Sequence, residues 1–82
     1  MSSLLDIRKE NHTIIQILDA CNQKQATTKL ELMYNCSLSH AKCTEFLLKM
    51  VKEGLLDYYE ETKVYKTTQA GRKLLIMWDI IK

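Results

Sequence analysis

The segment 28–40 constrains the fold more than any other part of this 82-residue chain. It begins with a short run in which Leu32 and Met33 supply the apolar face of a helix. A polar turn follows, and either Ser37 or Ser39 can cap the next helix by accepting a hydrogen bond from an early backbone N–H. The segment therefore predicts two short helices that are joined at a sharp angle by a tight turn.

Two short helices joined in this way form a helix-turn-helix, whose second helix commonly enters the major groove of DNA. Helical hairpins that bind no DNA share the pattern, so the residues that follow decide how it is interpreted. The next apolar residues fall on one side of a helix that ends near Glu53, and Gly54 is placed to end it in a left-handed conformation. These apolar residues are Cys43, Phe46, Leu47, Met50 and Val51.

Two runs rich in tyrosine and branched residues, 55–60 and 64–67, flank a polar turn and predict a β-hairpin. Cross-strand packing is the common use of tyrosines in such a hairpin. Thr68 then caps a final helix that runs to the end of the chain. With a first helix before residue 28, the predicted order is helix, helix, helix, hairpin, helix. This order predicts a winged helix-turn-helix, mainly α with a small β-hairpin (α+β).

The length of the chain fits one small domain over residues 1–82. The chain has no proline and therefore no obvious linker. Its formal net charge of +2 is mild for a nucleic-acid binder, so DNA binding depends on where the charges lie. No apolar run reaches transmembrane length, and the N-terminus lacks a basic region followed by an apolar stretch. We therefore expect a soluble, cytoplasmic protein with no membrane partner.

A helical wheel separates two faces of the predicted third helix. Its outer face carries Lys42, Glu45, Lys49 and Lys52. Lysines along one face can meet phosphates or guanine edges, and a glutamate can accept from a cytosine amino group. His40 falls on the inner side of the same wheel, so we expect it to pack against the core. A solvated surface can carry the same charges, but the position of this helix in a helix-turn-helix favours DNA.

Residues outside the outer face complete the predicted DNA contacts. Ser37 and Ser39 precede the recognition helix and would lie near phosphates at its N-terminus. Lys63 at the hairpin tip can touch phosphates, although Glu60 and Glu61 beside it would repel them. The predicted DNA-binding set is Lys29, Ser37, Ser39, Lys42, Glu45, Lys49 and Lys63.

The three cysteines form no C-x-x-C pair and the chain has only two histidines, so we expect no metal site and no cofactor. Cys21 and Cys43 fall on inner helix faces and are expected in the core, whereas Cys36 lies in the turn. A thiol-based sensor is an open alternative. No Ser-His-acid grouping or phosphate-cradling glycine loop occurs, so we expect neither an enzyme nor a small-molecule ligand.

The final helix carries more apolar residues than one small domain can cover. One side can dock on the domain's own core through Leu74, Met77, Trp78 and Ile81. A two-fold partner would cover the remaining apolar residues and present two recognition helices to successive major grooves. A monomer with a frayed last turn is the alternative. The predicted dimerisation segment is 68–82, and the predicted interface residues are Leu4, Leu5, Leu75, Ile76 and Ile80.

Several short motifs follow one another between residues 13 and 75. They are Ile14-Ile15, Leu18, Ala20-Cys21, Met33-Tyr34, Leu38-Ser39, Gly54-Leu55-Leu56 and Tyr65-x-x-Thr68-x-x-Gly71. In this order the chain resembles the archaeal winged-helix family of small dimeric DNA-binding proteins, sometimes described as chromatin-associated. The resemblance implies double-stranded DNA and a second copy of the chain as partners. It also implies a compact archaeal or archaeal-virus member, acting at the nucleoid or in the host cytoplasm.

The chain departs from that family where Lys29-Leu30-Glu31 replaces a lysine-threonine pair followed by a basic residue. Glu31 removes a positive charge from the helix-turn-helix surface. The best-known members carry a long final helix that pairs as an antiparallel coiled coil, and because the chain stops at Lys82 we expect any such coil to be truncated here. Two binding functions therefore stay open. One is a sequence-specific or architectural DNA-binding protein that regulates transcription as a homodimer. The other is a winged-helix module that binds protein in a larger assembly, which the glutamates on these surfaces favour.

Overall fold

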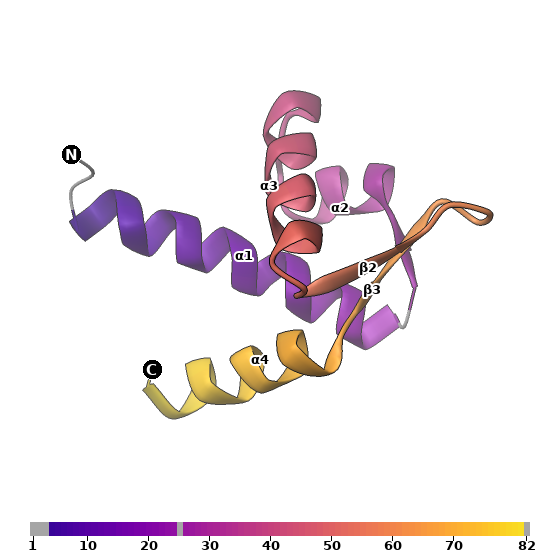
Figure 1. Cartoon of the computed structure of the whole chain (residues 1–82). Coiled ribbons are helices and arrows are strands. Elements are labelled where there is room, and N and C mark those ends of the chain that lie inside the picture. Colours follow the sequence, from indigo (N-terminus) through magenta and orange to yellow (C-terminus); the bar gives the residue numbers. More distant parts are fainter. Residues whose placement is uncertain (1–3, 25, 82) are drawn as a thin grey trace.

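The computed structural model describes the backbone of residues 4–24 and 26–81 and the side chains of residues 12–24 and 26–80. The described elements follow one another as predicted, with one additional short strand, and Figure 1 shows their arrangement. They are α1 (Leu4–Lys24), β1 (Thr27–Thr28), α2 (Lys29–Asn35), α3 (His40–Lys52), β2 (Leu56–Tyr59), β3 (Val64–Thr67) and α4 (Gln69–Ile81). The predicted winged helix-turn-helix of class α+β is confirmed.

The sheet has three antiparallel strands in the order β1-β3-β2, so the predicted hairpin gains a third strand. In the hairpin Tyr58 lies opposite Tyr65, and on the other edge of β3 Thr28 lies opposite Val64. The sequence analysis missed β1 because two residues are too few to show the alternation by which a strand is recognised. The half of β3 that is nearer the wing tip is therefore anchored to the segment that leads into α2.

The start of α2 is capped in both directions by Thr28 and Glu31. The Glu31 backbone N–H donates to Thr28 Oγ1, and that hydroxyl donates to Glu31 Oε1, each at 3.2 Å. The second Glu31 oxygen, Oε2, lies 3.3 Å from Lys24 Nζ at the end of α1. Glu31, which departs from the family pattern, therefore serves as a structural residue that fixes α2 against α1.

The turn between α2 and α3 places Ser37 in the left-handed region, with φ of +53°. The Leu38 N–H then donates to the Met33 carbonyl at 2.9 Å, which closes the end of α2. Ser39, and not Ser37, caps α3, because its Oγ accepts from the Lys42 N–H at 3.2 Å. The turn residues thus set the angle at which α3 leaves α2.

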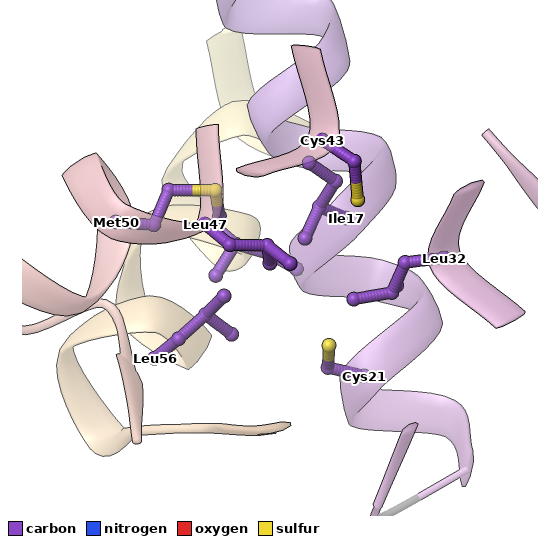
Figure 2. Packing of buried hydrophobic residues seen from close by; sticks show 8 residues of the cluster. Ile17, Cys21, Leu32, Cys43, Leu47, Met50 and Leu56 are labelled. Atoms are coloured by element: carbon purple, nitrogen blue, oxygen red, sulfur yellow. The ribbon is translucent and has the colours of Figure 1, made fainter. Parts of the chain in front are cut away.

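The core lies where α1, α2, α3 and β2 meet, and Figure 2 shows its side chains pointing toward one another. Its fully buried apolar residues are Ile17, Leu18, Cys21, Leu32, Cys43, Leu47, Met50 and Leu56. The predicted burial of Cys21, Cys43, Leu47 and Met50 is confirmed.

The joint between α3 and the wing is built around Gly54, whose φ is +79° as predicted. The Leu55 N–H donates to the Met50 carbonyl at 2.9 Å and so completes the helix end. Thr68 Oγ1 donates to the Gly54 carbonyl at 2.6 Å and accepts from the Gly71 N–H at 3.1 Å. One threonine therefore caps α4, as predicted, and also ties it to the joint.

The inner face of α4 differs from the prediction at two residues, because Leu75, which was predicted at the dimer interface, packs against the core, and Met77 does not. Leu74, Leu75 and Trp78 are half-buried, and α4 packs along α1. Met77, which was expected to dock on the core, is 55% exposed. The buried Gly71 sets the direction in which α4 faces the domain, and Met77 lies more than a quarter-turn away from that direction. The side chains of Leu4, Leu5 and Ile81 lie outside those that the structure describes.

Candidate nucleic-acid interface

The recognition helix α3 has one face fixed in the core and one face open to solvent. Cys43, Leu47 and Met50 are fully buried and hold the helix in place. The opposite face is exposed along its whole length, from the capped start to the last turn. It carries Ala41, Lys42, Glu45, Leu48, Lys49 and Lys52. The predicted outer-face residues are therefore exposed together on one helix.

The charges on this face are only weakly satisfied by the protein itself. Lys42 Nζ lies 3.8 Å from Glu45 Oε2, and both side chains are well exposed. Such an exposed pair contributes little to stability because water and salt screen it. Lys49 and Lys52 make no ion pair with any side chain that the structure describes. The lysines are thus available to phosphates or base edges.

The start of α3 brings together residues from two helices. Lys29 Nζ donates to His40 Nε2 at 3.1 Å, and the Lys29 carbonyl lies 3.9 Å from Cys43 Sγ. Lys29 of α2 therefore lies beside the first turn of α3, close to the Ser39 cap. The first backbone N–H groups of a helix attract anions, so this cluster of two basic side chains suits a phosphate.

His40 corrects the sequence prediction, because it is exposed and does not pack against the core. A wheel assigns a direction around the helix axis but says nothing about position along it. His40 is the first residue of α3, and helical side chains tilt toward the N-terminus, so it projects past the end of the buried face. The correction adds a residue to the candidate interface.

The wing tip lies at the far end of the hairpin formed by β2 and β3 (Figure 1), and Val64 next to it pairs with Thr28, the residue before Lys29. Lys63, a predicted contact, is exposed there with a left-handed φ of +57°. Glu60 and Glu61 beside it are exposed and have no ion pair with the described residues. The structure therefore groups Lys29, Ser39 and the α3 face, and it leaves Lys63 among carboxylates.

The hairpin tyrosines pack across the strands, as expected. The rings of Tyr58 and Tyr65 lie with centroids 4.7 Å apart, and Lys66 Nζ lies 4.8 Å from the centroid of Tyr59. Burial raises the pKa of the Tyr65 hydroxyl, with a smaller contribution from Tyr58. Tyr65 is therefore neutral at physiological pH.

Sequence reasoning missed Leu48, which is 68% exposed among the lysines of the α3 face. An apolar side chain on a recognition helix can contact the methyl group of thymine. The signal was present in the wheel, where Leu48 lies between Thr44 and Ala41, but Leu48 was assigned to neither face. Leu30 and Tyr34 on α2 are also exposed and also escaped the prediction.

The cysteines show no sign of activation. Burial raises the pKa of the Cys21 thiol to about 12, and it also raises the pKa values of Cys36 and Cys43. Cys36 is half-buried and is the least buried of the three, as its place in the turn predicted. Thiols with raised pKa values are poor nucleophiles at neutral pH, because the thiolate is the reactive form.

Comparison with known proteins supports the fold. No curated protein matches the chain. No helix in the described part of the chain combines the length and apolarity that a membrane span requires. The family described as winged helix-turn-helix matches residues 8–81, which cover every described element except the first turn of α1. From this match and from the capped turn between α2 and α3, the chain belongs to the winged helix-turn-helix family.

Proposed function

We propose that this protein binds double-stranded DNA through the outer face of α3 and regulates transcription as a homodimer. The observation that carries the proposal is the exposed face of a core-anchored helix, on which Lys42 has only an exposed ion pair and Lys49 and Lys52 have none with the described residues. Family membership supports it, because the winged helix-turn-helix suggests DNA binding. The resemblance to small dimeric archaeal proteins supports the regulatory and dimeric parts.

In this proposal α3 enters the major groove, which is wide enough to admit a helix. Lys29 and His40 lie at the phosphates beside the helix start, where the Ser39 cap and the helix dipole also favour negative charge. Lys42 and Lys49 face base edges or the flanking backbone, and phosphate contacts set the register. The wing contributes little, because its tip carries two unpaired carboxylates.

The salt dependence of binding to a generic duplex tests the DNA contacts. Each phosphate contact contributes about 0.9 to the slope of log K against log salt, because binding releases condensed counterions. Lys42→Gln/Lys49→Gln should lower that slope by about 2 and weaken binding at moderate salt. The matched control is Gln16→Glu/Gln69→Glu, which changes the net charge equally at exposed positions on α1 and α4.

The control separates contact from overall charge. Equal slopes for the two double variants would show that only net charge matters and that α3 is not the contact. Thermal melts of both variants should match the wild type, because the replaced side chains are exposed.

The homodimer is proposed from an apolar stripe on α4. Ile76, Met77 and Ile80 are 61%, 55% and 78% exposed and lie on the side that faces away from the domain. Exposed apolar residues gathered on one helix face commonly mark an interface. The beginning of α1 and the end of α4 lie at the same end of the molecule, opposite the wing tip (Figure 1). A two-fold partner on this stripe leaves the wing free.

Sedimentation equilibrium tests the dimer with Ile76→Glu/Ile80→Glu, which should convert a micromolar dimer into a folded monomer. The control is Leu30→Glu/Tyr34→Glu, which places two glutamates at the same spacing on exposed apolar residues of α2. A monomeric wild type, or equal dissociation in both variants, would reject the α4 interface.

A further inference from the structure

The outer face of the wing is hollowed. The hollow has a volume of about 780 Å³ and lies between the hairpin tip and the segment before β1. It is lined by Ala26, Tyr58, Tyr59, Glu60, Glu61, Thr62, Val64 and Lys66. Tyr59 and Val64 lie opposite each other in the register, three residues from the buried Leu56 and Thr67 respectively. Because side chains alternate along a strand, this pair faces away from the core.

The floor of the hollow is aromatic and apolar. Tyr59 is 44% exposed, and Val64 lies half-buried between it and β1. Tyrosine rings are enriched at protein interfaces, because each supplies a large contact area at a low cost in conformational entropy. The outer sheet face thus offers contact area that the core does not use.

The charge around the hollow selects its partner. Lys66 Nζ lies 4.8 Å above the centroid of the Tyr59 ring, so this ring already holds a cation in the structure. Glu60 and Glu61 at the rim have no ion pair with the described residues. A phosphate chain would be repelled by these carboxylates, whereas a lysine or arginine side chain would be attracted by them.

We propose that the outer face of the wing is a docking surface for a basic segment of a partner protein. An arginine or lysine of that segment pairs with Glu60 and Glu61, and its apolar neighbours cover Tyr59 and Val64. The surface is small, so the complex is a transient one. The α3 face stays free, which allows a DNA-bound copy of this protein to recruit the partner.

The test uses a short fluorescent peptide of alternating arginine and leucine, with a glutamate-for-arginine peptide as the negative control. Because the protein carries a net charge of +2, overall attraction to a basic peptide is not expected. Fluorescence anisotropy should show saturable binding of the arginine peptide alone. Glu60→Gln/Glu61→Gln should weaken it about tenfold, which is about 0.7 kcal/mol for each exposed pair.

Two controls make the result specific. Glu45→Gln/Glu53→Gln removes two exposed carboxylates elsewhere and should leave peptide binding within about twofold. Tyr59→Phe should bind as the wild type does, whereas Tyr59→Ala should bind more weakly, because the ring and not the hydroxyl supplies the contact area. Amide NMR shifts on peptide addition should map to the wing and Ala26.

Several outcomes would overturn the proposal. These are absence of saturable binding, NMR shifts confined to other surfaces, and equal weakening by the two carboxylate variants. Shifts of the wing amides on addition of duplex DNA without peptide would show that the wing belongs to the DNA interface. Loss of self-association in Glu60→Gln/Glu61→Gln would show that the occupant is a second copy of this chain. None of these results depends on whether α3 binds DNA.

Discussion

The recognition helix and the wing adjoin in the chain, yet the fold holds them in opposite ways. The inner face of α3 contributes Cys43, Leu47 and Met50 to the core, all fully buried. In β2 only Leu56 is buried, and the rest of the strand is exposed. The hairpin is held by its own strand pairing, by the tyrosine contact across it and by the short β1. At its base the buried Thr67 also donates a hydrogen bond to the Leu18 carbonyl of α1 at 2.8 Å.

The charges of the two regions differ as well. The α3 face carries lysines, while the wing tip carries two adjacent unpaired carboxylates. The net charge of +2 is a sum over the whole chain, so it reveals neither the basic surface nor the acidic one. The comparison teaches that one small domain can present a rigid basic surface and a lightly held acidic surface, which suit different partners.

Truncation of one side chain in each region should expose the difference in anchoring most strongly. Leu47→Ala removes a fully buried leucine of α3 and should lower the free energy of unfolding by about 2–5 kcal/mol. Tyr58→Ala removes a half-exposed wing ring and should cost about 1 kcal/mol. Urea unfolding followed by circular dichroism measures both. Equal losses would contradict the view that the core fixes α3 and not the wing.

Substitution of two glycines where α3, the wing and α4 meet should have the next largest effects on stability, and the two effects should differ. A Cβ on Gly71 would lie 2.5 Å from the Leu55 carbonyl oxygen and 2.7 Å from Thr67 Cγ2, so the backbone must shift. Gly71→Ala should cost about 1–3 kcal/mol. A Cβ on Gly54 meets nothing within 4 Å, and only its φ of +79° opposes a side chain.

Gly54→Ala should therefore cost about 1 kcal/mol, the usual penalty of a left-handed residue. Thermal melts of the two variants, with Ala41→Gly as an exposed helical reference, give the order. A larger loss at Gly54 than at Gly71 would show that helix termination, and not packing of α4 under the joint, limits this region.

Much of the fold could be predicted because several signals agreed at the same residues. The apolar spacing in α3, the Ser39 cap and the left-handed Gly54 all lie within one segment and act locally. The hairpin followed from two branched and aromatic runs around a polar turn. Such features depend on near neighbours in the chain, which a sequence displays directly.

The errors occurred where position along an element, or contact with a distant segment, decided the result. His40 lies on the inner side of a wheel but beyond the end of the core. Met77 is apolar, yet the buried Gly71 turns α4 so that Met77 faces outward. Strand β1 exists because β3 pairs with it, and the bond from Lys24 to Glu31 joins two helices. A periodicity argument contains none of these contacts.

The lysines of the candidate site were predicted, but two residues beside them were not. The outer face of α3 was assigned correctly as exposed, but His40 and Leu48 were left out of it. Their roles, like those of the predicted contacts, are tested by the DNA-binding experiments.

The smallest expected effect is on the free energy of unfolding, and it distinguishes Glu31 of the helix-turn-helix from Glu60 and Glu61 of the wing. Hydrogen bonds from Lys24, and then from Thr28, lower the pKa of the exposed Glu31 carboxyl below its ordinary value of 4.5. A carboxyl with a lowered pKa in the folded state adds stability that is fully present above about pH 4.5 and is lost as the pH falls through the folded value. The wild type should therefore exceed Glu31→Gln slightly in unfolding free energy at pH 7, and the gap should close in acid.

Glu60→Gln/Glu61→Gln removes carboxylates that no described residue pairs with, so it should open no gap at pH 7. Urea unfolding of the wild type and of both variants at pH 7 and pH 3 measures these differences in unfolding free energy. A gap for the wing variant equal to that for Glu31→Gln would mean that the wing carboxylates help to hold the fold, and then they would not be free for a basic partner.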